Sequence, residues 1–123
     1  MRNYRSLWSA AVLALVLAGP AAATTLLSQT LRVASGDFPS CNIVNAGTRE
    51  ITVKAELLDV HGGVADEQTF TVLPGGESGN STSGVIGNCH CRFIGAFSKR
   101  DVRASMDVLS GADLGTRVTA PAY

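Results

Sequence analysis

The chain has 123 residues, with ten acidic and ten basic residues and three cysteines. This length is close to the common size of a single domain. A net charge of zero does not indicate a phosphate-neutralising surface, so we expect no nucleic-acid partner.

The N-terminal segment, residues 1–23, has the pattern of a cleaved signal peptide. Arg2 and Arg5 form a basic region, residues 7–18 are apolar, and a proline and three alanines follow. The apolar run is shorter than the ~20 residues of a membrane-spanning helix, and no later stretch approaches that length. Cleavage would leave one domain, residues 24–123, with 8 basic and 10 acidic residues and a net charge of −2. The alanine-rich leader indicates a bacterial protein that is secreted or periplasmic, with no membrane span in the mature chain.

The mature chain reads as short strands separated by turns rich in Gly, Pro and Asn. Alternation is clearest where Ile51, Val53 and Ala55 would face the core and Lys54 and Glu56 would face solvent. No segment carries a helical period, and the spacing leaves no room for crossover helices, so the fold class is an all-β antiparallel sandwich or barrel. The seven predicted strands, with an eighth at 114–119 that could complete the sheet, cover residues 25–33, 41–44, 51–60, 67–73, 78–86 (an edge strand or loop), 89–97 and 102–109.

The cysteines lie on strands that would face one another. In the stretch "GNCHCRF", Cys89, Cys91 and Phe93 share the core-facing side, and His90 lies on the opposite side. Cys41 has the same phase relative to the apolar residues of its own strand. In an oxidising compartment we expect a Cys41–Cys91 disulfide, which leaves Cys89 as a free or intermolecular thiol. A Cys41–Cys89 disulfide is the competing pairing.

Cys41, Cys89, His90 and Cys91 could instead form a metal or thiol-redox site. The strand geometry places His90 away from the cysteines, and neither paired zinc knuckles nor a C-x-x-C motif is present. The chain also has no nucleophile, base and orienting group in a recognisable pattern, so we expect no catalytic residue, no enzyme activity and no cofactor. The acidic residues are predicted to be solvated, on outward strand faces and turns.

One charged turn could contact a partner. Lys99, Arg100 and Asp101 lie between the predicted strands 89–97 and 102–109. Such a turn is either a solubilising hairpin tip or a contact loop for a partner molecule.

The stretches "CNIVNAGTREITVKAELLDVHGGV", "TFTVLPGGES" and "CRF" resemble small bacterial secreted domains of the immunoglobulin or fibronectin type III kind, including CARDB-type domains. The shared marks are a short strand ending in N-x-G-T, a long alternating strand ending in a Gly turn, and a strand closed by L-x-P-G. The resemblance covers roughly residues 41–109 and implies an immunoglobulin-like β-sandwich that binds or spaces rather than catalyses. The mature chain departs from antibody domains because it contains no tryptophan to pack against the disulfide.

These observations lead to one functional hypothesis and two alternatives. We expect a non-enzymatic binding or adhesion-type module that is stabilised by a disulfide, with a protein or surface glycan as its unidentified partner. One alternative is a small periplasmic metal or thiol-redox protein that uses the Cys/His cluster. The other is a structural accessory subunit of an envelope assembly, joined to its partner through Cys89.

Overall fold

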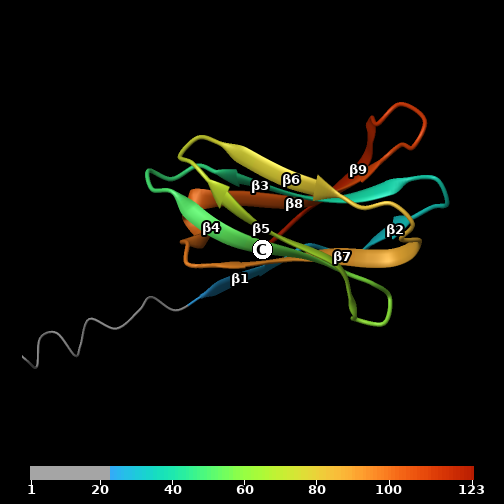
Figure 1. Ribbon diagram of the computed structural model, residues 1–123, viewed down its shortest axis with the longest axis horizontal. Coiled ribbons are helices and arrows are strands. Elements are labelled where there is room, and N and C mark those ends of the chain that lie inside the picture. The colour runs from blue at the N-terminus through green and yellow to red at the C-terminus, as the bar shows by residue number, and fades with distance from the viewer. Residues whose placement is uncertain (1–22) are drawn as a thin grey trace, which may run out of the picture.

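The computed structural model describes residues 23–123, apart from the side chain of Arg117 (Figure 1). The predicted signal peptide, except for Ala23, lies outside the described residues. In the described chain no helix is long and apolar enough to cross a membrane. The elements are β1 (Thr24–Leu27), β2 (Leu31–Val33), β3 (Phe38–Asn45), β4 (Ile51–Leu58), β5 (Val64–Val72), β6 (Glu77–Ser81), β7 (Gly87–Gly95), the 3₁₀ turn η2 (Lys99–Asp101), β8 (Val102–Leu109) and β9 (Thr116–Pro121).

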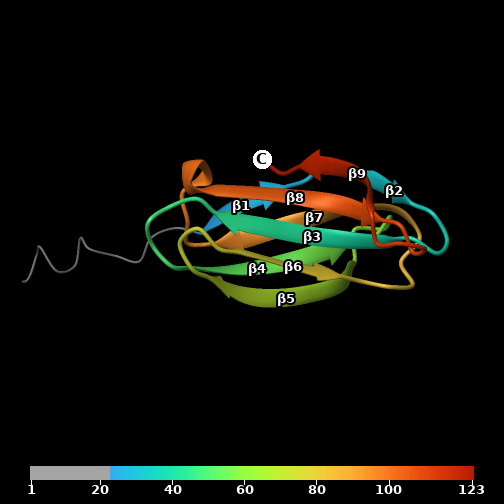
Figure 2. The ribbon, with the colours of Figure 1, turned by 90° about the horizontal axis from the view of Figure 1, so that it is seen from above.

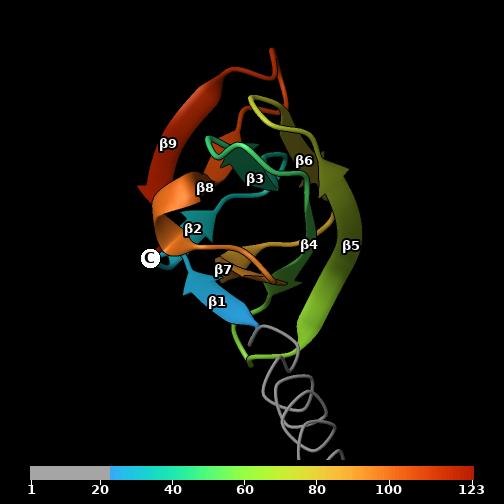
Figure 3. The ribbon, with the colours of Figure 1, turned by 90° about the vertical axis from the view of Figure 1, so that its left-hand side faces the viewer.

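The nine strands form two antiparallel sheets that pack face to face (Figures 2 and 3). The first sheet has the order β1-β7-β4-β5, and β2 pairs with the same strand, β7, as β1 does. The second sheet has the order β6-β3-β8-β9. The prediction of an all-β antiparallel sandwich is therefore confirmed, and the predicted segment 78–86 contains an edge strand, β6.

The strand count exceeds the seven or eight predicted because the first predicted strand divides into β1 and β2. Between them, Ser28 Oγ accepts a hydrogen bond from the backbone N–H of Cys91 at 2.8 Å, and Ser28 also bridges to Ala122. A side chain that bonds to the neighbouring backbone competes with the regular ladder, so the pairing with β7 is interrupted here. The alternation of apolar residues in the sequence does not predict such a break.

The core lies between the sheets and follows the predicted alternation. The inward residues of β4 and β7 are buried, and a disulfide between Cys41 of β3 and Cys91 of β7 joins the two layers with a Cα–Cα distance of 5.8 Å. The favoured pairing is therefore the one present, and Cys89 is a free thiol. The buried cluster comprises Leu26, Val33, Cys41, Ile43, Ile51, Val53, Ala55, Leu57, Phe70, Val72, Cys89, Cys91, Phe93, Phe97, Val102, Ala104, Met106 and Val108.

Two further links join the edges of the sheets. Beside β1, Leu27 and Tyr123 exchange backbone hydrogen bonds of 2.9 and 3.0 Å, so the last residues of the chain bridge from β9 to the first sheet. At the opposite side, Asp66 of β5 accepts hydrogen bonds from Asn80 at 2.7 Å and Thr82 at 2.6 Å. Figure 3 shows the resulting closed outline, in which β5 and β6 lie side by side. Backbone contacts thus join one pair of edges, and side chains join the other.

One predicted exposure is wrong. Glu56 lies on the outer face of the first sheet, as its phase in β4 predicts, but its side chain is only 5% exposed. Arg92, the neighbouring residue on β7, donates a 2.9 Å hydrogen bond from Nε to Glu56 Oε1 and covers it. This hydrogen bond holds the pKa of Glu56 below its ordinary value, against the opposing effect of burial. The sequence pattern assigns a face to each residue, but it does not show which long side chain covers a neighbour.

Candidate ligand-binding pocket

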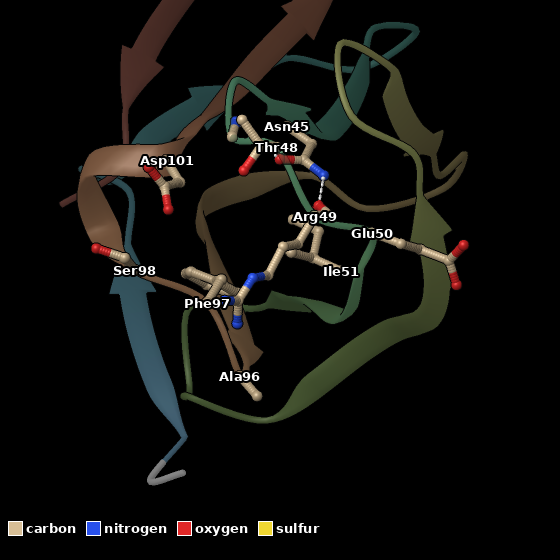
Figure 4. Close-up of a pocket in the computed structure, with 10 residues that line it drawn as sticks. Asn45, Thr48, Arg49, Glu50, Ile51, Ala96, Phe97, Ser98 and Asp101 are labelled. Atoms are coloured by element: carbon tan, nitrogen blue, oxygen red, sulfur yellow. Dashed lines mark hydrogen bonds between the residues drawn. The ribbon is translucent and has the colours of Figure 1, made fainter.

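A pocket of about 510 Å³ opens at the end of the sandwich where β3 turns into β4 and β7 leads into η2 (Figure 4). This volume falls within the range of typical small-ligand sites, about 300–1,000 Å³. The loop between β3 and β4 and the segment from β7 into η2 supply its walls. The lining residues are Asn45, Gly47, Thr48, Arg49, Glu50, Ile51, Ala96, Phe97, Ser98 and Asp101.

Asn45 shapes the first wall. Its fully buried side chain donates hydrogen bonds to the carbonyl oxygens of Arg49 at 2.7 Å and Val72 at 3.0 Å. Its Oδ1 atom accepts a hydrogen bond from the backbone N–H of Gly47 at 3.0 Å, which closes the turn. The asparagine of the N-x-G-T stretch therefore has a structural role: it fixes the loop that carries Thr48 and Arg49.

The second wall is held against the first by close backbone contact. The N–H of Ala46 donates to the carbonyl oxygen of Asp101 at 2.7 Å. A Cβ atom on Gly47 would lie 2.9 Å from the Cβ of Asp101, so glycine permits the approach of the two loops. Thr24 Oγ1 also donates to the carbonyl oxygen of Phe97 at 2.7 Å, which anchors the start of β1 at this end.

The floor of the pocket is apolar and its rim is polar. Ile51 and Phe97 are each 8% exposed and belong to the core cluster. Figure 4 shows Arg49 extending toward Phe97, with Thr48 and Asp101 on another side of the opening and Glu50 pointing away from it. The pocket therefore combines a small apolar surface with two hydroxyls and two opposite charges.

Some polar side chains on the sheet faces of the described chain are bonded to one another, whereas those at this rim are not. Within residues 23–123, hydrogen bonds link Arg92 to Glu56, and Asn42 and Thr119 to Asp107. In the same part of the chain the structure shows no intramolecular hydrogen bond or ion pair to four side chains that line the pocket: Thr48, Arg49, Ser98 and Asp101. Thr48, Arg49 and Ser98 are exposed and Asp101 is half-buried, so a ligand could reach all four groups.

The predicted contact loop divides between two surfaces. Asp101 lines the pocket described above, whereas Lys99 lines a second pocket of about 490 Å³ with residues of β8 and the C-terminal segment. Arg100 is exposed, and its carbonyl oxygen accepts a hydrogen bond from Arg103. Thr48, Arg49, Phe97 and Ser98 line this pocket together, which the sequence did not predict. The turn signal at "NAGT" located a loop, but the sequence alone did not show that this loop meets η2.

The Cys/His cluster is not assembled as the metal alternative requires. Cys41 and Cys91 are joined in the disulfide, so their sulfurs are not available as thiolates. Cys89 is 1% exposed, and burial, with a smaller effect from Asp59, raises the pKa of its thiol. A partner thiol could not reach Cys89 without local opening of the sandwich. In the described part of the chain, no group of three or more His, Cys, Asp or Glu residues is arranged to hold a metal ion.

The two histidines lie away from the pocket. His61 is exposed in the loop that follows β4, at the end of that strand opposite the pocket, and its backbone N–H donates to Asp59 Oδ1 at 2.9 Å. His90 pairs with Leu58 at the same end of β4. Neither imidazole can therefore act on a ligand held between Arg49 and Asp101.

Comparisons with known proteins supply no relative from which a ligand could be transferred. The resemblance to immunoglobulin-like and CARDB-type domains stays a prediction that depends on turn residues. No protein-family model, curated protein or solved structure matches this chain.

Proposed function

We propose that the protein is a non-enzymatic binding module that is secreted or periplasmic and that takes its ligand in the pocket between the β3–β4 loop and η2. The observation that carries this proposal is a pocket in which the unbonded side chains of Thr48, Arg49 and Asp101 border an apolar floor. Ligand sites combine this kind of concave apolar surface with a few oriented polar groups. Loops that a rigid β-scaffold positions are also common sites of binding.

The scaffold supports this role because the pocket walls are fixed from several directions. Asn45 holds the β3–β4 loop, the Ala46–Asp101 hydrogen bond holds η2, and the Cys41–Cys91 disulfide holds the two sheets together. A preorganised site loses less conformational entropy when it binds than a mobile loop does. The disulfide is compatible with an extracellular location, where such bonds persist.

The alternatives receive less support from the thiols. A metal or redox role would need reactive sulfurs, but two are joined to each other and the third is buried. A structural subunit linked to its partner through Cys89 would need that thiol at the surface, and its side chain faces the core.

The proposal can be tested by nuclear magnetic resonance on the isotope-labelled, exported protein. The ligands are mixtures of short peptides and of oligosaccharides, added one mixture at a time. We expect at least one mixture to shift the amide signals of Thr48, Ala96 and Ser98, while those of His61 and Gly63, at the other end, stay in place. A ligand that shifts only signals remote from the pocket would show that the binding surface lies elsewhere.

A further inference from the structure

We infer that the ligand of this pocket carries both a carboxylate and an ammonium group, as a free amino acid or a short unblocked peptide does. The inference depends on the proposed function, because it assigns a ligand class to the same site. It comes from the two charged side chains, Arg49 and Asp101, that line the opening and have no ion-pair partner in the described part of the chain; Glu50, the third charged lining residue, points away from the opening (Figure 4).

The two charges come from different elements. Arg49 belongs to the β3–β4 loop and Asp101 is the last residue of η2. Neither takes part in the ion pairs found within residues 23–123, which join Lys54 to Glu56, Lys54 to Glu67 and Arg92 to Glu56. The guanidinium and the carboxylate therefore do not neutralise each other directly, although they line the same pocket (Figure 4).

A ligand with separated opposite charges complements this arrangement. The guanidinium of Arg49 can hold a carboxylate through two parallel hydrogen bonds, and the carboxylate of Asp101 can accept hydrogen bonds from an ammonium group. The hydroxyl group of Thr48, which lies beside Asp101 and faces the opening, offers a further hydrogen bond.

Other ligand classes fit the charges less well. A neutral sugar could form hydrogen bonds with both side chains, but it would carry no charge to complement either of them, and hydrogen bonds between two charged groups are the stronger ones. A polyanion would be attracted by Arg49 but repelled by Asp101. Glu50 also lines the pocket, but its side chain points away from the opening, so it does not alter this balance (Figure 4).

The floor favours a small apolar group between the two charged ends. Ile51 and Phe97 expose only 8% of their surfaces, so they offer a limited patch rather than a deep apolar cavity. The dipeptide alanyl-alanine, with a free amino group, a free carboxyl group and two methyl side chains, is therefore a suitable probe.

The test measures the binding of three probes to the exported protein by isothermal titration calorimetry and amide shift titration. The probes are alanyl-alanine, its N-acetyl derivative and its C-terminal amide. Because each lost charge-assisted hydrogen bond corresponds to about a tenfold change in affinity or more, both blocked probes should bind about tenfold more weakly than the free dipeptide.

Two variants assign each charge to its partner. Arg49→Gln should bind the free dipeptide no better than the amide, while it still discriminates against the N-acetyl form. Asp101→Asn should lose discrimination against the N-acetyl form and keep it against the amide. Glu67→Gln, which removes an exposed carboxylate of β5 that does not line the pocket, is the matched control and should bind like the unmodified protein. Thermal unfolding of each variant shows that the fold is retained.

The outcomes separate the ligand class from the proposed function. If the three probes bind equally, or if an oligosaccharide shifts the pocket signals and the free dipeptide does not, the zwitterion assignment is wrong and the binding role stands. If neither peptides nor oligosaccharides shift the pocket signals, both the assignment and the proposed function are wrong. Loss of carboxylate recognition in Arg49→Gln only, together with loss of ammonium recognition in Asp101→Asn only, would support the assignment.

Discussion

Removal of the Cys41–Cys91 disulfide should destabilise the fold more than any of the substitutions discussed below. The bond spans a sequence separation of 50 residues and joins β3 of one sheet to β7 of the other. In the chain-entropy description, a cross-link that closes a loop of this length raises the free energy of unfolding by about 4 kcal/mol. A domain of about 100 residues is typically stable by only 5–15 kcal/mol, so this one bond could supply a quarter or more of the total.

The assay is urea unfolding of the Cys41→Ala/Cys91→Ala double variant, compared with the oxidised protein. Circular dichroism is the suitable signal, because the one tryptophan of the chain, Trp8, lies in the expected leader. The unmodified chain, unfolded in the presence of a reductant, separates loss of the cross-link from loss of the buried sulfur atoms. Cys89→Ala keeps the disulfide and controls for the substitution of a buried cysteine.

We expect the double variant and the reduced chain to lose similar amounts of stability, each near 4 kcal/mol. The midpoint of thermal unfolding should fall by about 15 °C or more, since 1 kcal/mol corresponds to roughly 4–8 °C in a domain of this size. A loss below about 1 kcal/mol in both would refute the reasoning, because the bond would then not constrain the unfolded chain as this description requires.

Three further predictions follow from buried polar and thiol groups. Arg92→Gln should destabilise the fold more at pH 7 than at pH 3. The pKa of Glu56 is lower in the folded protein than in the unfolded chain, so its ion pair with Arg92 contributes fully above the unfolded-state pKa of Glu56. This contribution is lost as the pH falls through the folded-state pKa of Glu56. Unfolding curves across this pH range check it, and an effect independent of pH would contradict it. Asn45→Ala should cost about 2 kcal/mol, because three hydrogen bonds of a buried side chain are lost, whereas the exposed Asn88→Ala should cost little; equal losses in urea unfolding would exclude this role. Cys89 should resist alkylation at pH 8 in the native protein and react once urea unfolds the chain, as mass spectrometry would show; modification of the native protein would mean that the strand opens readily.

Much of the architecture follows from local patterns. Apolar alternation identified most of the strands, and it assigned Cys89, Cys91 and Phe93 to the core face of β7, where all three are buried. The segment 102–109 matches β8 at both ends. The same alternation predicted a disulfide between Cys41 and a cysteine of β7, but it places Cys89 and Cys91 on the same face. Cys91 was favoured because it lies deeper in the strand, beside Phe93, and the structure has this pairing.

Alternation failed where a side chain determined the outcome. Ser28, which lies between β1 and β2, interrupts their pairing with β7 because its Oγ accepts a hydrogen bond from the backbone N–H of Cys91. Glu56 is buried because Arg92 covers it from the adjacent strand. In both positions the contact joins residues far apart in the sequence, and no periodicity records which distant residue will lie beside a given side chain.

By itself the sequence determined the fold class and the face of most strand residues, because a strand buries alternate residues whichever neighbour it acquires. It favoured the Cys41–Cys91 disulfide, but the choice over Cys41–Cys89 came from the tertiary structure. Only the tertiary structure decided the candidate site. The loop of Thr48 and Arg49 and the turn of Ser98 and Asp101 are about fifty residues apart in the sequence. They meet because the order of strands in two packed sheets places the end of β3 and the end of β7 at the same end of the sandwich.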